Sequence, residues 1–401
     1  MNRYIKVSML FVVLSALPLM QTSAQFQLPN EAPAGFDNKT NGFVNQTEFD
    51  ELLDTFSEVE DAADGLGPTF NEASCATCHS IGAIGGAGLN LETRAGTIKN
   101  GEFVEHAGGS LVHDRVLSQC RQLQEHVGAN EPFTKRASLS TLGDGFIEAI
   151  ADDTIIAISR LQPPDMRGTV IRVPILEAKN PNVTRVGRFG WKNQHASLES
   201  FSADAYLNEM GVTSDLLPVE NTAEGRSVAS CDKVADPEDE DNDVRLFADF
   251  MRATKVPDRG PISPLEEIAG LATFVATGCA TCHVPVLVTA PTGTAINGGA
   301  FRVPPALGSK IIKPFSDLLL HDVGTNDPIV QNGGPGTYNQ VRTPPLWGLR
   351  KRQSQLMHDG QATSIEGAIT RHKGQALKAY DAYNALSTQE RARLLTFLRS
   401  L

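Results

Sequence analysis

Hydrophobic positions recur at helical spacing in three segments of the last third of the chain. Each segment opens with a capping signal, in which Ser or Thr is followed three residues later by Glu. The three signals are Ser263/Glu266 with Pro264 between them, Thr363/Glu366 and Ser387/Glu390. The apolar positions that follow them are Leu265, Ile268, Leu271 and Val275; Ile365, Ala368 and Ile369; and Leu394, Leu395, Leu398 and Leu401. We therefore predict a helix in each segment.

The first 24 residues have the pattern of an export signal. Arg3 and Lys6 precede an apolar run over 7–20, and small residues over 22–24 offer a cleavage site. The run is shorter than the roughly 20 residues that span a bilayer. We expect residues 1–24 to be a cleaved signal peptide and the product to reside in the periplasm, with no stable membrane anchor.

Composition bounds the remaining possibilities. The chain has 401 residues, of which 41% are hydrophobic, and this length favours two domains over one. Asp and Glu number 47 against 35 Lys and Arg, which gives a net charge of -12. This balance opposes attraction to phosphate backbones, so nucleic acid is excluded as a partner.

The strongest chemical signal is a repeated pentapeptide. Cys75-Ala76-Thr77-Cys78-His79 and Cys279-Ala280-Thr281-Cys282-His283 are both Cys-x-x-Cys-His sequences, the attachment motif of c-type haem. Two thiols and an imidazole on one turn can bond the porphyrin and ligate its iron. A redox dithiol has no use for the trailing His, and a zinc site would draw ligands from both pairs. We predict two covalently bound c-type haems, with iron ligands His79 and His283.

Two further cysteines, Cys120 and Cys231, remain outside these motifs. An even number in an oxidising compartment is compatible with a disulfide, but the sequence does not test the required approach of their Cα atoms.

An internal duplication is visible downstream of each motif. Ser197-Leu198-Glu199 pairs with Ser364-Ile365-Glu366, and six residues after each Glu lie Ala205 and His372 respectively. His372 continues the apolar face of the helix predicted after Thr363, so it points inward. Alanine cannot bind iron, and the N-terminal haem therefore lacks this ligand. His106, His113 and His126 are alternative ligands for that iron, and we rank His113 first.

With these motifs in hand, the chain resembles the bacterial di-haem cytochrome c peroxidase superfamily, in particular its di-haem oxidoreductase (thiol oxidoreductase-like) branch. The markers are Gly65-Leu66-Gly67-Pro68, Gly187-Arg188-Phe189-Gly190-Trp191-Lys192, Asp317-Leu318-Leu319-Leu320-His321-Asp322, Arg342-Thr343-Pro344-Pro345-Leu346-Trp347 and Met357-His358-Asp359-Gly360. The resemblance implies a mainly α fold with two cytochrome c-like haem domains and long irregular loops. We place them at 25–250, with insertions, and 251–401.

The resemblance also implies site residues. The helix after the His-Asp-Gly segment places His372 as the second ligand of the C-terminal haem. Glu199 falls where the peroxidases keep a catalytic carboxylate, with Glu148 as the runner-up. Calcium, which the peroxidases hold between their domains, stays open, because their Thr-x-Pro element is replaced here by Gln353-Ser354-Gln355.

These observations predict a periplasmic di-haem oxidoreductase that reduces hydrogen peroxide or another small oxidant with electrons from a periplasmic donor protein. One haem would meet the oxidant while the other relays electrons. Two alternatives stay open at this point: a di-haem electron carrier without substrate, and peroxide-driven oxidation of an organic or protein substrate.

Overall fold

The computed structural model describes residues 29–401; the predicted signal peptide lies outside this range. The described chain is 31% helix and 17% strand, with several small sheets. The prediction of a mainly α fold is therefore wrong. The reason is that most strands are two or three residues long, too short to give an alternating pattern, and lie in segments rich in turn residues.

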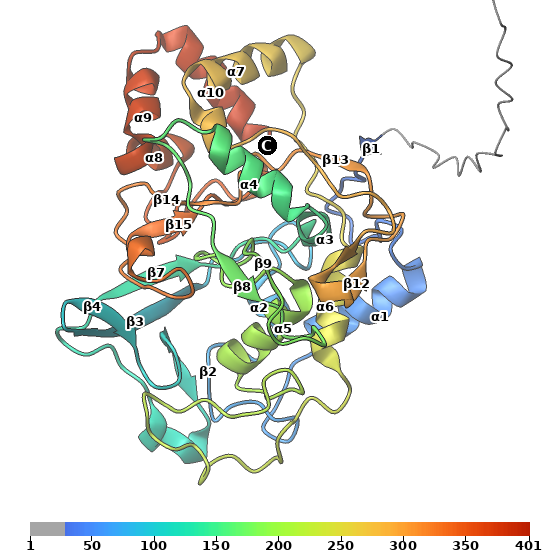
Figure 1. Ribbon diagram of the computed structural model, residues 1–401, viewed down its shortest axis with the longest axis vertical. Helices are drawn as coiled ribbons and strands as arrows, with labels where there is room; N and C mark the ends of the chain where they lie inside the picture. Colours follow the sequence, from blue (N-terminus) through green and yellow to red (C-terminus); the bar gives the residue numbers. More distant parts are fainter. Residues whose placement is uncertain (1–28) are drawn as a thin grey trace, which may run out of the picture.

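The helices, labelled in Figure 1, are α1 (Gln46–Ser57), α2 (Cys75–Cys78), α3 (Asp144–Glu148), α4 (Asp152–Leu161), α5 (Leu198–Ala205), α6 (Asp243–Ala253), α7 (Pro264–Ala276), α8 (Ile365–Thr370), α9 (Leu377–Asn384) and α10 (Thr388–Arg399). A π-helix, η2 (Tyr206–Met210), continues α5. Among the described residues, none of these helices is long and apolar enough to cross a membrane.

The strands are β1 (Asn30–Glu31), β2 (Thr69–Phe70), β3 (Leu91–Lys99), β4 (Glu102–Glu105), β5 (Leu111–Val112), β6 (Arg115–Val116), β7 (Phe133–Ala137), β8 (Arg172–Pro174), β9 (Thr184–Val186), β10 (Leu287–Val288), β11 (Ala295–Ile296), β12 (Phe301–Arg302), β13 (Lys310–Ile312), β14 (Leu320–Asp322) and β15 (Gln340–Arg342). The largest sheet has β3 at its centre, paired with β4, β5 and β7.

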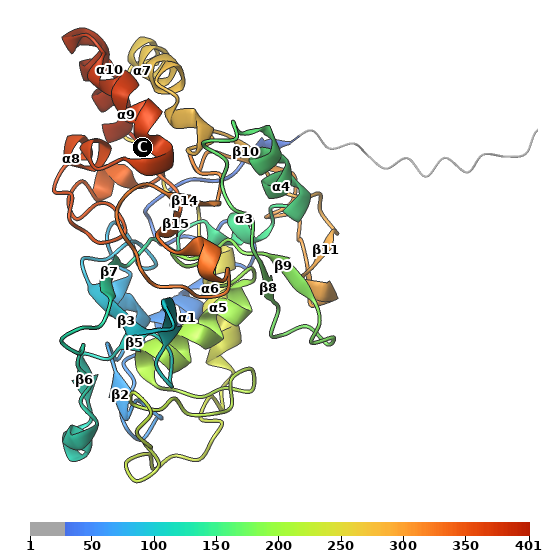
Figure 2. The ribbon, with the colours of Figure 1, turned by 60° about the vertical axis from the view of Figure 1, so that its left-hand side comes forward.

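Two helix groups surround the two Cys-x-x-Cys-His segments. In the first, α1 and α5 pack on α6, and Phe56 of α1 stacks on Phe250 of α6 with ring centres 4.5 Å apart. In the second, α7 and α8 pack on α10, the red and gold helices that lie side by side in Figures 1 and 2. Each group thus places two helices packed on a third beside one motif, which agrees with an internal duplication.

The three predicted C-terminal helices are confirmed, with two differences. The N-cap of α8 is Ser364, whose side chain accepts from Gly367 N, and not Thr363. The apolar stripe of α7 faces solvent: Leu265 and Ile268 are 81% and 66% exposed. Gly270 determines this orientation, because a Cβ there would overlap the side chain of Phe397 on α10.

The two halves of the chain are interleaved at their sheets. Strand β1 pairs in parallel with β13, so the start of the described chain lies against a strand more than 270 residues later. One large apolar core also includes residues of both halves, from Phe49 to Trp347. The boundary that we place between residues 250 and 251 falls inside α6, and the division into two haem domains stays a prediction.

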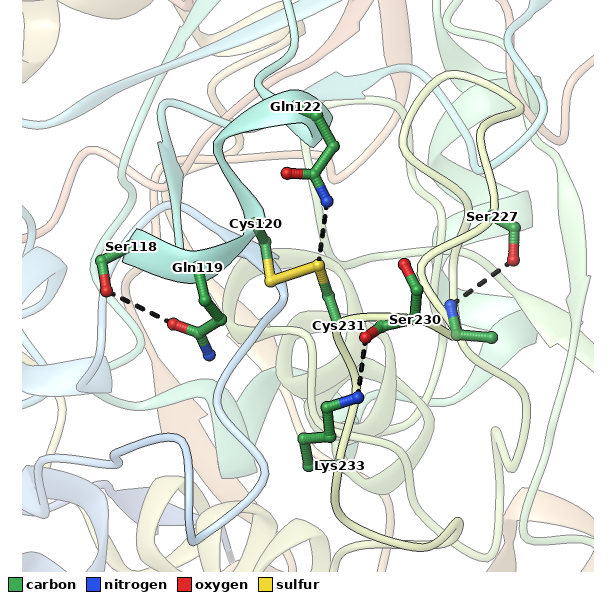
Figure 3. The surroundings of a disulfide bond; sticks show 9 residues. Ser118, Gln119, Cys120, Gln122, Ser227, Ser230, Cys231 and Lys233 are labelled. Atoms are coloured by element: carbon green, nitrogen blue, oxygen red, sulfur yellow. Dashed lines mark hydrogen bonds between the residues drawn. A yellow bond between two sulfur atoms is a disulfide. The ribbon is translucent and has the colours of Figure 1, made fainter.

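Cys120 and Cys231 form a disulfide, the pairing that the sequence left open (Figure 3). Their Cα atoms are 5.8 Å apart, within the range for a disulfide. Beside it, the Gln122 amide donates a hydrogen bond to the sulfur of Cys231 at 3.3 Å. The disulfide connects the loop after η2 to the segment that follows β6.

Candidate functional site

Each Cys-x-x-Cys-His segment opens onto its own cavity. The N-terminal cavity, of about 390 Å³, is lined by Cys75, Cys78 and His79. The C-terminal cavity, of about 240 Å³, is lined by Cys279, Cys282 and His283. The two cysteine pairs therefore lie in separate cavities, which excludes the zinc site that would join them.

The four thiols are unpaired and have no thiolate character. Burial raises the pKa of Cys75 and of Cys78 to about 12, and it raises the pKa of Cys279 and of Cys282 as well. A redox dithiol requires the opposite shift, because the thiolate is the nucleophile. The four thiols line the two cavities and lack the low pKa of a redox dithiol.

Three histidines carry their proton on Nδ1. His79 Nδ1 donates to Gly86 O at 3.2 Å, His283 Nδ1 to Phe315 O at 3.0 Å, and His372 Nδ1 to Ala368 O at 2.8 Å. Burial lowers the pKa of all three, that of His283 to about 4 with His372 as the second cause. Each ring is therefore neutral with Nε2 free, the state that ligates a metal.

His283 and His372 face each other across the C-terminal cavity, with ring centres 6.4 Å apart. A ligating nitrogen lies about 2 Å from its metal and about 1 Å from its ring centre, so two imidazoles on opposite sides of one ion are about 6 Å apart. The observed separation matches. His372 is brought there by α8: Ile365, Ala368 and Ile369 line the same cavity.

The N-terminal cavity repeats this arrangement with one difference. The histidine of each Cys-x-x-Cys-His segment lies beside a phenylalanine, with ring centres 6.4 Å apart in both cases. Phe56 lies beside His79, and Phe274 lies beside His283. Helix α5 begins at N-cap Ser197 as α8 begins at Ser364, and Ala205 lines its cavity at the register position of His372. Among the described residues that line this cavity, His79 is the one histidine.

The donor set fits a haem in each cavity. Both cavities combine a cysteine pair with an imidazole whose Nε2 is free, and a large apolar wall. In the C-terminal cavity, His358 is 1% exposed, and neither ring nitrogen has a hydrogen-bond partner within residues 29–401. A buried polar group of this kind is costly unless it is satisfied, which a cofactor with polar substituents does.

The comparisons with known proteins agree with this geometry. A family described as "Di-haem oxidoreductase, putative peroxidase" matches residues 118–401, a range that contains the second Cys-x-x-Cys-His segment and His372. The chain belongs to the di-haem oxidoreductase family. No curated protein matches the sequence.

Among solved structures, hydrazine synthase from Kuenenia stuttgartiensis aligns with this di-haem oxidoreductase over 100% of both chains, at 13% identity and a TM-score of 0.39. A likeness at this level carries no argument about the function of this oxidoreductase.

The carboxylates expected at the N-terminal cavity of the oxidoreductase lie outside it. Glu199 is on α5 but faces away from the cavity that Phe201, Ser202 and Ala205 line. Glu148 is fully buried and binds Arg252 at 2.8 and 3.0 Å while also accepting from Leu198 N. Burial opposes its ionisation, but Arg252 holds the pKa of Glu148 below its usual value. Glu148 therefore joins α3, α5 and α6.

His113 is also outside the cavity. Its Nδ1 lies 2.8 Å from the Glu125 carboxylate and its Nε2 2.7 Å from Asn208 O, so both ring nitrogens are engaged in hydrogen bonds. At 2% exposure it is a core residue of the loop region. Ligation of iron by His113 would require breaking one of these contacts.

Sequence reasoning missed Glu209. It lies in η2, four residues beyond Ala205, and lines the N-terminal cavity. Burial and the charge of Glu92 raise the pKa of Glu209 well above its usual value, which favours its protonated form. The signal was present: the face formed by Phe201 and Ala205 continues to residue 209 at a spacing of four.

The two cavities share a wall. Leu139, Ser140, Trp191 and Arg342 line both of them. The Trp191 indole donates to Ala137 O at 2.8 Å and meets His358 edge to face. Beside this wall, burial raises the pKa of Asp144 to about 8. The C-terminal and N-terminal cofactors would thus be separated by one layer of side chains.

Proposed function

We propose that this protein is a periplasmic di-haem peroxidase, with hydrogen peroxide reduced at the N-terminal cavity. The haems are attached covalently, through Cys75 and Cys78 at the N-terminal site and through Cys279 and Cys282 at the C-terminal site. The observation that carries the proposal is the pair Ala205 and His372, equivalent in register but different in chemistry.

The difference assigns a task to each site. His283 and His372 would both hold the C-terminal haem, and a haem held by two histidines would supply electron transfer alone. At the N-terminal site, His79 supplies one ligand and the methyl group of Ala205 leaves space opposite. A small oxidant can occupy that space.

Peroxide reduction breaks the O–O bond and consumes two protons and two electrons. When bound, the two haems would supply iron and would relay the two electrons that come from the donor protein. Glu209 supplies a proton from the wall of the same cavity, with its carboxyl oriented by Asn71, whose amide donates to Oε2 at 2.6 Å. A protonated carboxyl is the form required to protonate a leaving oxygen.

The shared wall supports electron transfer between the sites. Trp191 is the aromatic side chain that lines both cavities, and its hydrogen bond to Ala137 fixes the indole plane. Electrons enter from a periplasmic donor protein at the C-terminal site and pass this wall.

Two features support the periplasmic location. The signal pattern of residues 1–24 predicts export, and the Cys120–Cys231 disulfide is typical of oxidising compartments.

The proposal is tested on the purified protein in two steps. A pyridine haemochrome assay on denatured protein is expected to give two haems per chain that acid-acetone does not extract. Stopped-flow mixing of half-reduced protein with hydrogen peroxide is then expected to consume two electrons per peroxide. Extractable haem contradicts covalent attachment. Two haems that stay low-spin and six-coordinate in every redox state, with no peroxide reduction, would instead identify an electron carrier.

A further inference from the structure

Glu209 has a second carboxylate beside it, contributed by the sheet around β3. Glu92 and Arg94 are two residues apart on β3, so their side chains point to the same face, and β7 places Arg136 opposite Glu92. All three residues line the N-terminal cavity together with Glu209. The sheet thus delivers one carboxylate and two guanidinium groups to the wall that carries the acid.

Arg94 lies between the two carboxyl groups. Its Nε and Nη2 bind the two oxygens of Glu92 at 2.9 and 3.1 Å, and Nη2 is 3.6 Å from Oε1 of Glu209. One positive charge cannot neutralise two carboxylates. Because Arg94 holds both carboxyl groups on one wall, repulsion between two carboxylates there favours a proton on one of them.

Three other charged groups around the pair already have partners of opposite charge. Arg136 is bound by Asp327 at 3.0 Å, Glu72 by Arg115 at 2.7 Å, and Asp204 by His195 at 3.1 Å. Asp114, which also lines the cavity, is exposed to solvent. Asp144 also lines the cavity, where burial raises its pKa to about 8 and Arg342 is its neighbouring positive charge. Glu92 and Glu209 are thus two carboxyl groups that share one guanidinium group, that of Arg94.

We propose that Glu92 and Glu209 share one proton at the wall of the N-terminal cavity, and that Glu92, held by Arg94, keeps this proton on Glu209. Glu92 is a positioning residue, because it acts on the oxidant through Glu209. Use of the proton in peroxide reduction rests on the proposed function, whereas the shared proton itself does not.

Burial favours a protonated Glu92, but Arg94 outweighs burial and holds the pKa of Glu92 below its usual value. Burial and the neighbouring negative charge of Glu92 raise the pKa of Glu209. The pair therefore offers a donor and an acceptor on one wall. In the reduction of HOOH, the O–O bond breaks and two O–H bonds form. Glu209 gives one proton to the leaving oxygen, solvent gives the second, and the donor protein provides both electrons.

The side chains of Glu92 and Glu209 are 22% and 32% exposed, and both line the N-terminal cavity. A proton that Glu209 gives up in turnover would be replaced from solvent, so that the pair again holds a single proton.

Infrared titration of the di-haem protein, without peroxide, tests the shared proton. The C=O stretch of a protonated carboxyl is followed against pH in wild type, Glu209→Gln, Glu92→Gln and Glu92→Asp. We expect a component of this band that persists above the ordinary titration range of Glu in wild type and is lost in Glu209→Gln, whereas the contribution of Asp144, whose pKa burial raises to about 8, stays in every variant. In Glu92→Gln the Glu209 component should titrate about 1 to 2 pH units lower, because the negative neighbour is gone while Arg94 remains. Glu92→Asp, which keeps the charge, should restore the wild-type titration.

An unchanged titration in Glu92→Gln would overturn the proposal, and so would a band in Glu209→Gln that matches the wild type. Glu199→Gln, a glutamate on α5 outside the cavity, is the matched control and should leave the band unchanged. Because no peroxide is present, the result is independent of whether the protein is a peroxidase. If the wild-type protein gives the expected infrared titration but does not reduce peroxide, only the proposed function is contradicted.

Discussion

Ala205 occupies in the N-terminal cavity the position that His372 occupies in the C-terminal cavity. Both residues are seven positions after the first residue of a helix capped by serine, and both line the cavity of their own Cys-x-x-Cys-His segment. The duplicated scaffold therefore carries two different axial sites. In the proposed function, this one histidine, present in one copy and replaced by alanine in the other, would separate an electron-transfer site from a site open to a small oxidant.

Replacement of His372 should affect the C-terminal haem alone. His372→Ala removes one of the two imidazoles that face each other at 6.4 Å and leaves both Cys-x-x-Cys-His segments intact. We expect one of the two low-temperature haem signals to change its spin state or ligand, while the haem content stays at two. An unchanged spectrum in the folded variant would show that His372 is not a ligand.

Glu209→Gln should lower peroxide turnover by about 10²–10⁴-fold, the usual contribution of a positioned acid or base. Gln keeps the size of Glu and its contact with Asn71 but cannot deliver a proton. The matched variant Glu199→Gln should turn over at the wild-type rate, because Glu199 lies outside the cavity. Steady-state kinetics with a saturating electron donor compares the two, and equal rates would exclude Glu209 as the acid.

The pH dependence of turnover follows from the same residue. Burial and the charge of Glu92 raise the pKa of Glu209, so its acid form persists to higher pH than that of an ordinary Glu and is lost as pH rises through the raised pKa. The rate should therefore fall on the alkaline side. In Glu92→Gln this fall should move to lower pH, since removal of a negative neighbour makes Glu209 ionise more easily. A pH–rate profile that coincides with the wild type would contradict this.

Glu148 should matter for stability. Its ion pair with Arg252 is almost fully buried, with side-chain exposures of 0% and 3%. Glu148→Gln should cost about 3 kcal/mol, the low end for breaking a buried pair, because Asp249 still contacts Arg252. Since the folded-state pKa of Glu148 is lowered, its contribution is present above the unfolded pKa of about 4.3 and is lost as pH falls through the folded value.

Urea unfolding of wild type and Glu148→Gln at neutral pH and near pH 3 measures this contribution. The difference between the two midpoints should be large at neutral pH and should shrink in acid. Equal midpoints at neutral pH would mean that Arg252 finds another counter-charge.

Local motifs and single helices were predictable from the sequence, and long-range pairing was not. The Cys-x-x-Cys-His segments, the capping boxes of α7 and α10, and the inward orientation of His372 depend on residues close in the chain. Glu92 lies near Glu209 because β3 pairs with β7, about 40 positions later in the chain, and because Arg94 of β3 contacts Glu209 of η2, more than a hundred positions later. No periodicity in the chain records such a contact.

Glu199 and Glu209 illustrate the same limit on one helix. Glu199 lies on α5 and Glu209 lies ten residues later on η2, and the family resemblance favoured Glu199. The residues that line the cavity are Phe201, Ala205 and Glu209, which are spaced by four. Glu199 does not belong to this series and therefore lies on another face of the helix. The exposed stripe of α7 is a comparable case, because Gly270 decides which side of that helix packs on α10.

Electron paramagnetic resonance of the oxidised and half-reduced protein, compared with Ala205→His, shows whether the N-terminal haem is open. We expect two haem signals in wild type, one from a six-coordinate site with two histidines and one from a site that becomes open to exogenous ligands on half-reduction. In Ala205→His, an imidazole in the register of His372 should close the second site, make both haems low-spin and abolish peroxide turnover. If the wild-type N-terminal haem is already closed in both redox states, or if Ala205→His still reduces peroxide at the wild-type rate, Ala205 does not keep that site open.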